Sequence, residues 1–209
     1  MLFRSTNVSL MSAARIGGVD GGALVSRQTV APFSLPARAH ALARLPDGRV
    51  LLIGRRPGTF AAIVDPALAD EGETPRIFGP SAGRRFAGHA AVSPDGRTLV
   101  TSEIDAETGE GAVVFRAAKS GAIQAVYPAG IEPHDLLFAR GGARLIVAVG
   151  GIAHAADVKG PAMNAGKIES FIAEIDPHSG AMLERHALPA DLKSLSLRHM
   201  ALEIGRAHV

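Results

Sequence analysis

A motif recurs along this chain, and the repeat constrains the fold more than any other feature of the sequence. Each copy begins with a histidine, continues into a short apolar run, passes a tight turn and enters a second apolar run. The histidines are His40, His89, His134 and His199, separated by 49, 45 and 65 residues. Periods of about 40–50 residues are typical of four-stranded β-propeller blades. The chain is therefore expected to be a repeated all-β structure.

The turns within the repeat have the chemistry of β-hairpins. Residues 46–48 and 94–96 both read Pro-Asp-Gly, and Gly141 and Gly142 stand at the same place in the third copy. Proline sets φ at the start of a turn, aspartate caps the turn with its side chain, and glycine accepts a positive φ. The flanking runs are rich in Val, Leu and Ile, which predicts the two strands of a hairpin.

A second hairpin follows in each complete copy, with strands expected at 112–116 and 123–127, and again at 170–175 and 182–188. Two hairpins make a four-stranded antiparallel meander, which is a propeller blade. The expected blades are a partial one at 8–37, then 38–86, 87–131 and 132–196, and the start of another at 197–202. A β-sandwich also has short strands and many turns, but it does not explain the near-constant spacing of the motif.

The two ends of the chain depart from this pattern. An apparent strand at 8–14 begins almost at Met1, and the first fifteen residues have no apolar core of a signal peptide. Residues 203–209 look like the in-frame translation of a sequencing adapter. We therefore expect residues 1–202 to be one partial propeller domain, cut from a ring of seven blades, and 203–209 to be an artefact.

Composition excludes several classes of function. The chain has no cysteine, which rules out disulfides, thiolate catalysis and cysteine-based zinc or iron–sulfur sites. The longest apolar runs are short, so no segment is expected to span a membrane. The net charge is only +2 and the basic residues are scattered, so no nucleic-acid partner is expected. Patterns of nucleophile elbows, phosphate loops and dinucleotide sites do not occur.

A series of short motifs resembles one known family. They are Arg-Arg-Pro-Gly-Thr-Phe at 55–60, Gly-His at 88–89, Ser-Pro-Asp-Gly at 93–96, the acidic segment at 102–111, Pro-His at 133–134, Val-Gly-Gly-Ile at 149–152 and Ser-Leu-Arg-His at 196–199. In this order they resemble the bacterial domain-of-unknown-function family numbered 1513, over about residues 9 to 202.

This resemblance implies a periplasmic seven-bladed propeller of the YVTN and quinoprotein-dehydrogenase-like kind. Such proteins are usually exported by a twin-arginine signal, and their genes often lie beside those of imelysin-type iron-uptake lipoproteins. The family supplies no activity to transfer. This chain departs from the family pattern because it lacks the export signal and the final blades.

The four repeated histidines are the foremost candidates for a site. The first strand of a propeller blade lines the central channel, so equivalent residues of successive blades surround one axis. Neutral imidazoles bind Fe, Cu or Zn, and Asp135 is placed to orient one of them. We therefore take His40, His89, His134 and His199 as candidate metal ligands. The alternative is a structural role, because Gly88-His89 resembles the Gly-His pair of WD-type blades and repeats often conserve packing residues.

Two further groups are candidates for ligand contacts. Glu103 and Asp105, with Glu107 and Glu110, form an acidic segment that offers oxygen ligands to a hard cation, with Glu103 expected nearest the channel. Their spacing is not that of an EF-hand loop, and a solvated loop is the alternative. Arginines offer bidentate clamps for carboxylate or phosphate, or ion pairs that tie blades together. The arginines in question are Arg56, in the pair at 55–56, and Arg198, beside His199.

A long insertion at 153–167, which contains His154, Asp157, Lys159 and Asn164, exceeds an ordinary loop and favours a role at one face of the propeller. The repeated histidines and the missing catalytic motifs predict a non-catalytic binding or scaffold protein. The family resemblance implies that it acts in the periplasm in metal uptake, specifically of iron, with imelysin-type proteins as partners. One alternative is a metal-dependent oxidoreductase or hydrolase with its site at the channel mouth. Another is a platform for protein interactions alone.

Overall fold

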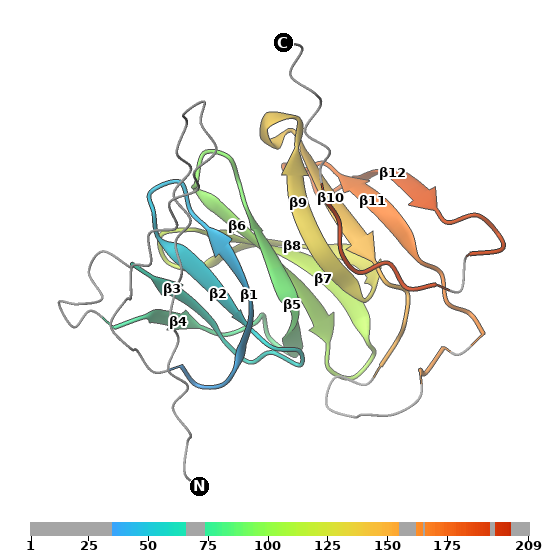
Figure 1. The fold of residues 1–209 in the computed structure, drawn as a ribbon, viewed down its shortest axis with the longest axis horizontal. Helices are drawn as coiled ribbons and strands as arrows, with labels where there is room; N and C mark the ends of the chain where they lie inside the picture. The colour runs from blue at the N-terminus through green and yellow to red at the C-terminus, as the bar shows by residue number, and fades with distance from the viewer. Residues whose placement is uncertain (1–34, 66–73, 155–161, 165, 193–194, 202–209) are drawn as a thin grey trace, which may run out of the picture.

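Three four-stranded antiparallel sheets follow one another along the chain in a computed structural model that describes residues 35–65, 74–154, 162–164, 166–192 and 195–201. In every sheet the spatial order of the strands is their order in the sequence (Figure 1). The strands are β1 (Ala39–Arg44), β2 (Val50–Gly54), β3 (Ala61–Val64), β4 (Arg76–Phe78), β5 (Arg84–Val92), β6 (Thr98–Asp105), β7 (Glu110–Ala117), β8 (Ile123–Ile131), β9 (Pro133–Ala139), β10 (Arg144–Val149), β11 (Phe171–Ile175) and β12 (Met182–Ala187). The described residues contain no α-helix, and a single 3-10 turn spans Arg140–Gly142.

The turn between β5 and β6 shows why the sequence forms meanders. The amide of Gly96 donates to the carbonyl oxygen of Ser93 over 2.8 Å, and Gly96 has a φ of +70°. The carboxylate of Asp95 accepts a hydrogen bond from the Ser93 hydroxyl (2.6 Å) and one from the amide of Arg97 (3.0 Å). The Pro-Asp-Gly sequence thus reverses the chain and supplies hydrogen bonds from within the turn itself.

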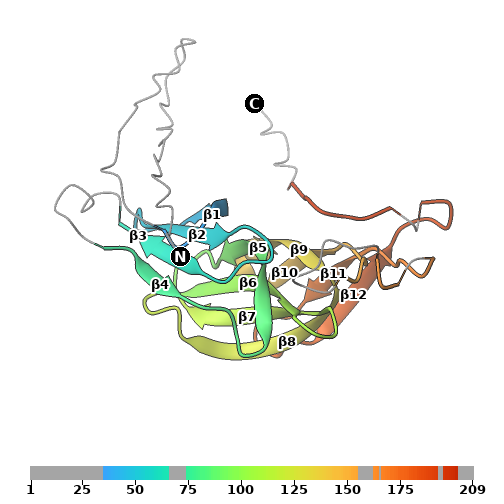
Figure 2. The same ribbon diagram turned by 90° about the horizontal axis from the view of Figure 1, so that it is seen from below.

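The first strands of the three sheets lie together at the centre of the structure. β1 contacts β5, and β5 contacts β9. In Figure 2 these three strands lie along one side, whereas β4, β8 and β12 spread away from them. Each sheet therefore has an inner strand and an outer strand, as the blades of a propeller do. The prediction of an all-β propeller fold built from four-stranded antiparallel blades is confirmed, and the described residues form three such blades.

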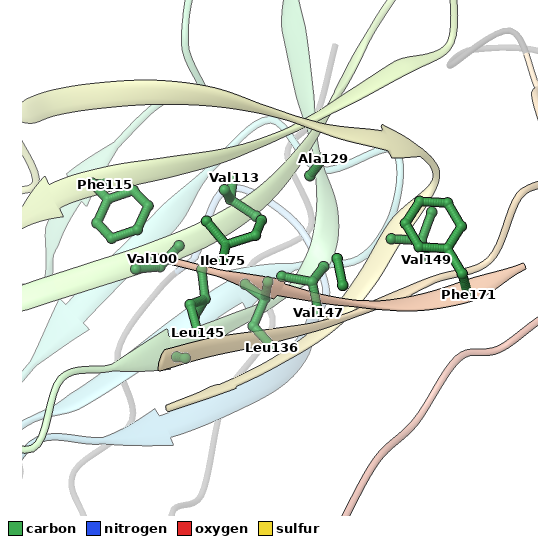
Figure 3. Packing of buried hydrophobic residues seen from close by; sticks show 12 residues of the cluster. Val100, Val113, Phe115, Ala129, Leu136, Leu145, Val147, Val149, Phe171 and Ile175 are labelled. Carbon is green, nitrogen blue, oxygen red and sulfur yellow. The ribbon is translucent and has the colours of Figure 1, made fainter. Parts of the chain in front are cut away.

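Apolar packing between neighbouring sheets supplies the core. The second sheet is covered on both faces, so β6 and β7 are buried over nearly their whole length. Successive side chains point to opposite faces of a strand: Leu99 packs with Leu51 and Phe86 between the first two sheets, and Val100 packs with Val147 between the second and third. Figure 3 shows the second of these clusters. Because the second sheet lies between two neighbours, β6 and β7 are apolar on both faces. A strand with one face exposed would instead alternate apolar and polar residues.

The hairpin strands expected from the sequence coincide with β7 and β8 and with β11 and β12. β5 begins at Arg84, before the expected blade boundary at 86, because residues 84–86 pair with residues 103–105 of β6 ahead of a bulge. The apparent strand at 8–14 and the segment 203–209 lie outside the described residues. No helix in the described part of the chain is long and apolar enough to cross a membrane.

The Asp95 turn predicts a pH-dependent stability. The hydrogen bond from Ser93 and then that from the Arg97 amide hold the pKa of Asp95 below its ordinary value of 3.8. A carboxyl group whose pKa falls on folding stabilises the folded state above its unfolded pKa, and this contribution is lost as the pH drops through the folded value. Asp95→Ala should therefore lower the midpoint of thermal unfolding at neutral pH, and the difference from the wild type should narrow below about pH 4.

Circular dichroism melts over this pH range measure the effect. Glu107→Ala is the matched control, because it removes the same charge from an exposed turn residue whose side chain accepts no hydrogen bond among the described residues. A difference between Asp95→Ala and the wild type that stays constant with pH would contradict the role given to the ionised carboxylate.

Candidate metal centre at the inner strands

Each inner strand carries its repeated histidine at a break in strand pairing. The pairing of β1 with β2 shifts at His40, and that of β5 with β6 shifts between Phe86 and Ala90, around His89. In β9 the shift falls after Pro133 and includes His134. A β-bulge bends the strand and re-aims the side chain at the extra residue. The repeat thus presents an imidazole from the same point of three neighbouring sheets.

Three of the four imidazoles form a compact cluster, which we call the histidine cluster: His89, His134 and His199. One potential ligand nitrogen from each lies within 4.8 Å of the others. The ring centroids are 4.7 Å apart for His89 and His134, and 5.2 Å apart from each of these to His199. The structure therefore brings together side chains that are up to 110 residues apart in the sequence.

His40 lies at the rim of this cluster. Its ring meets that of His89 edge-on, with centroids 5.2 Å apart, but its nitrogens are not within the compact group of three. It is also exposed, whereas His134 is buried. Gly88 makes the close approach of His40 to β5 feasible, because a Cβ at that position would lie 3.0 Å from the His40 ring. The predicted ring of four is thus a cluster of three with a fourth histidine against its edge.

The cluster favours neutral imidazoles. Burial, followed by the proximity of His89 and Arg198, lowers the pKa of His134 to about 3. Burial also lowers the pKa of His89, against the opposing effect of the Asp135 carboxylate. The Nε2 atom of His89 and the Nδ1 atom of His134 are buried and have no hydrogen-bond partner among the described residues. Neutral imidazoles with unpartnered nitrogens are the form that binds metal ions.

One carboxylate holds two parts of the cluster in place. Asp135 Oδ1 lies 3.6 Å from His89 Nδ1. The other ring nitrogen of His89, Nε2, is the one without a hydrogen-bond partner among the described residues. Its other oxygen accepts a hydrogen bond of 2.9 Å from the amide of Met200, the residue after His199. A carboxylate beside the second nitrogen of a ligating histidine is the usual outer partner in metal sites. Asp135 occupies the place that the sequence analysis gave it.

The backbones that carry His89 and His134 share a second tie. The hydroxyl of Ser102, a buried residue of β6, lies 3.2 Å from the carbonyl oxygen of His89 and 3.1 Å from that of His134. This contact joins the second and third sheets directly beneath two members of the histidine cluster.

Arg56 and Arg198 converge on a residue that the sequence analysis did not select. Both guanidinium groups pair with Oε1 of Glu132, at 3.4 Å for Nη2 of Arg198. Glu132 links β8 to β9, is 1% exposed, and has a φ of +57°. The sequence carries only a weak signal for it, a glutamate immediately before the Pro-His pair of the third repeat, because both arginines come from distant segments.

Gly150 and Gly151 close β10 against this link. Their amides donate to the carbonyl oxygens of Glu132 and Ile131, each over 2.9 Å. A Cβ on Gly150 would lie 2.8 Å from Glu132 Oε2, so the close approach of the carboxylate requires glycine there. At the base of the insertion, Asn164 bridges the Ala153 amide and the Gly151 carbonyl. Asp157 and Lys159 of the insertion lie outside the described residues.

Glu103 belongs to β6 and is fully buried, where an acidic loop was expected. Its carboxylate accepts hydrogen bonds from the amide and hydroxyl of Ser81, at 2.7 and 2.6 Å, and from Thr101 at 2.9 Å. Arg116 Nη2 completes the set at 2.6 Å. The guanidinium of Arg116 also lies over the ring of Phe78 of β4, 5.2 Å from its centroid. This network ties the first sheet to the second.

Asp105 ends β6 and caps the following turn, accepting hydrogen bonds from the amides of Glu107 (3.0 Å) and Thr108 (2.9 Å). Neither Glu103 nor Asp105 joins the histidine cluster within ligand distance. Among the described residues the other grouping with ligand spacing is Glu174, Glu184 and His186, on the largely exposed β11–β12 edge.

The fold and this cluster define a β-propeller protein with a candidate metal centre where its inner strands meet. The sequence matches the model of the family described as "Protein of unknown function (DUF1513)" over residues 33–207, and the chain belongs to this family. No curated protein matches the sequence at a significant level.

Solved structures resemble the chain only distantly. "Structure of U3-55K" and "Crystal structure of RRP9 WD40 repeats" each have a TM-score of 0.49 and 12% identity, and the aligned part covers 71% of this chain and 40% of theirs. The "Kuenenia stuttgartiensis Hydrazine Synthase" has a TM-score of 0.43 and 16% identity, covering 70% of this chain and 48% of that one. The chain thus spans less than half the length of these structures.

The Glu103 network predicts a large loss of stability on breaking it. Glu103→Ala leaves the Arg116 guanidinium buried without its carboxylate, and removing one partner of a buried ion pair costs about 3–5 kcal/mol. Urea unfolding measures this change. The exposed Glu110→Ala, the matched control, should shift the free energy of unfolding by no more than about 0.5 kcal/mol.

A variant that replaces both Glu103 and Arg116 tests whether the lone buried charge causes this loss of stability. Glu103→Leu combined with Arg116→Met leaves no lone charge, so the double variant should be more stable than Glu103→Leu alone. The donors of Ser81 lose their acceptor in both variants and therefore do not affect this comparison. Equal destabilisation by the single and double changes would show that the pair is not the cause.

Proposed function

We propose that this propeller is a non-catalytic binding protein whose histidine cluster holds a transition-metal ion. One observation carries the proposal: imidazoles from successive sheets converge, and two of them bury nitrogens that have no partner among the described residues. Leaving a buried polar atom unpaired costs free energy. A metal ion would satisfy these atoms, and a purely structural role for the histidines would leave the cost unexplained.

The donor set narrows the choice of ion. Neutral imidazoles suit Zn, Cu and Fe, whereas Ca and Mg prefer oxygen ligands. A tetrahedral ion with metal–nitrogen bonds of about 2.0–2.1 Å requires nitrogens about 3.3 Å apart. The nitrogens of the cluster lie within 4.8 Å of one another, so binding requires a small inward rotation of the rings. His199 is exposed and is the ring with room to make it.

We extend the proposal to the biological setting that the family resemblance implies. The protein would act in the periplasm as a binding or scaffold component of metal uptake, with iron as the cargo and imelysin-type proteins as partners. A site of neutral imidazoles at the meeting point of the inner strands supports this role, because Fe²⁺ accepts such ligands. Detection of iron in protein purified from periplasm would test this extension.

The second candidate, a metal-dependent oxidoreductase or hydrolase, is favoured by one feature of the cluster. Three histidine ligands with a remaining open position are the arrangement of catalytic zinc sites such as His₃ centres. Glu103, the carboxylate expected nearest the channel, pairs with Arg116 and Ser81 instead. Turnover of a chromogenic ester by the zinc-loaded chain, abolished by His134→Ala, would favour the enzyme over the binding protein.

Metal binding by the full chain tests the main proposal. The wild type should bind Zn²⁺ in competition with a chromophoric chelator. Loss of an outer partner of a metal ligand lowers metal affinity roughly 10- to 100-fold, and His89→Ala or His134→Ala should each lower it by more than that. Asp135→Asn should fall within that range, and His40→Ala should have a smaller effect because His40 lies outside the compact group.

Two controls make the result specific. His178→Ala removes an exposed histidine from the β11–β12 turn, and His186→Ala removes the histidine of the other grouping of potential ligands. Both should leave Zn²⁺ affinity unchanged. If His89→Ala and His134→Ala bind Zn²⁺ as the wild type does, the cluster is not the metal centre.

A further inference from the structure

We propose that the histidine cluster takes its metal ion together with a small carboxylate anion, which Arg56 and Arg198 bind beside the ion. This inference rests on the proposed function and adds the chemical class of a second ligand. It follows from the charges that surround the cluster, from the hydrogen-bond donors left on the two arginines, and from the number of histidine ligands.

The charge around the cluster disfavours a bare cation. Arg56 and Arg198 share one carboxylate, that of Glu132, which lies two residues before His134. Two guanidinium charges thus meet a single carboxylate charge next to imidazoles that are neutral. Both arginine charges also bear on His134, whose pKa they help to lower. A divalent ion would add to this positive charge, and at low local dielectric such repulsion is costly.

An anion that arrives with the metal removes this imbalance. Asp135 supplies a second carboxylate charge near His89, but Arg38 and Arg55 place two further guanidinium charges near His40, at the rim of the cluster. Positive side chains therefore still outnumber carboxylates around the cluster, and a bound anion would offset this excess. A carboxylate would bring the charge and an oxygen ligand at once.

The two arginines retain the donors that such an anion needs. Each guanidinium has five N–H groups in a planar fork, and both arginines pair with the same oxygen, Glu132 Oε1. Among the described residues neither has another ion-pair or hydrogen-bond partner. Their side chains are 31% and 38% exposed, so a ligand can reach part of each side chain from solvent. Such forks match the geometry of a carboxylate.

Glu132 has the properties of a residue that positions these forks. It is fully enclosed, and its second oxygen, Oε2, is turned toward Gly150, where it has no partner among the described residues. A buried carboxylate held by the backbone of the β8–β9 link gives the two flexible arginines a common anchor. Arg198 is also next to His199 in the chain, so one short segment carries both a guanidinium fork and one of the proposed metal ligands.

The coordination of the ion completes the argument. Three histidines leave at least one position of a four-coordinate ion for an outside ligand. A carboxylate that binds the ion through one oxygen can accept N–H groups from an arginine with the other. The site is therefore selective for a metal carried with a carboxylate over either component alone.

The experiment uses the full chain loaded with Co²⁺, whose visible absorption reports changes in its ligands. Acetate is titrated against chloride at constant ionic strength. In the wild type the spectrum should change saturably, and acetate should raise the affinity for Co²⁺ by the same factor by which Co²⁺ raises the affinity for acetate, as linkage requires. A parallel titration of free Co²⁺ with acetate is recorded without protein, and its spectral change is subtracted.

Arg198→Ala and Arg198→Lys separate charge from geometry. Both should weaken acetate binding to the Co²⁺-loaded chain by about tenfold or more, because the lysine lacks the planar fork. Arg198→Lys keeps a charge opposite Glu132 and guards against loss of folding, which circular dichroism checks. Without acetate, Arg198→Ala should bind Co²⁺ at least as tightly as the wild type, since one repelling charge is gone. Arg97→Ala, at an exposed turn, is the matched control and should change neither affinity.

The outcomes distinguish the two proposals. A wild-type chain that binds no Co²⁺ overturns the proposed metal site and this inference with it. A chain that binds Co²⁺ through His89 and His134, but whose spectrum and metal affinity do not respond to acetate, overturns the inference alone. Acetate binding that is the same in Arg198→Lys as in the wild type also overturns it, because the arginine fork would then have no part.

Discussion

The packing of each sheet against the next is the constraint on which the rest of this structure depends. The second sheet buries Leu99 against the first sheet and Val100 against the third, and it can do so only if both neighbours lie flat on its faces. Sheets stacked in this way, each with its natural twist, fan out from their first strands. The meeting of β1, β5 and β9 is therefore a consequence of hydrophobic burial, and the site inherits its geometry from it.

Polar contacts then determine how the inner strands meet. Ser102 joins the backbones of His89 and His134, and Asp135 connects the His89 ring to the segment that carries His199. On the other face of the same sheet, Glu103 and Arg116 form a buried pair between the first and second sheets. Buried polar groups contribute little net stability unless they are fully satisfied, but they define one arrangement among many that apolar packing alone would permit.

The sequence was informative where the controlling interactions are local or periodic. The turn at Pro94, Asp95 and Gly96 contains its own hydrogen bonds, so its residues suffice to predict the hairpin. The spacing of His40, His89 and His134 was sufficient to predict that equivalent strands bring them near one axis. It could not separate His40 from the others, because the exposure of His40 and its place outside the compact group depend on the packing of neighbouring sheets.

Residues whose partners are distant in the chain could not be found in this way. Glu132 pairs with Arg56, 76 residues earlier, and with Arg198, in a segment after the last strand. Glu103 reads as part of an acidic segment, and only the pairing of β6 with β7 shows that Arg116 lies beside it. The arginines themselves were recognised as groups that either bind an anion or pair with a carboxylate. In the structure, one buried carboxylate, that of Glu132, pairs with both guanidinium groups. It positions both arginines but balances only one of their two charges. In the proposed site, the positive charge that remains beside the imidazoles would favour a cation that carries its own anion.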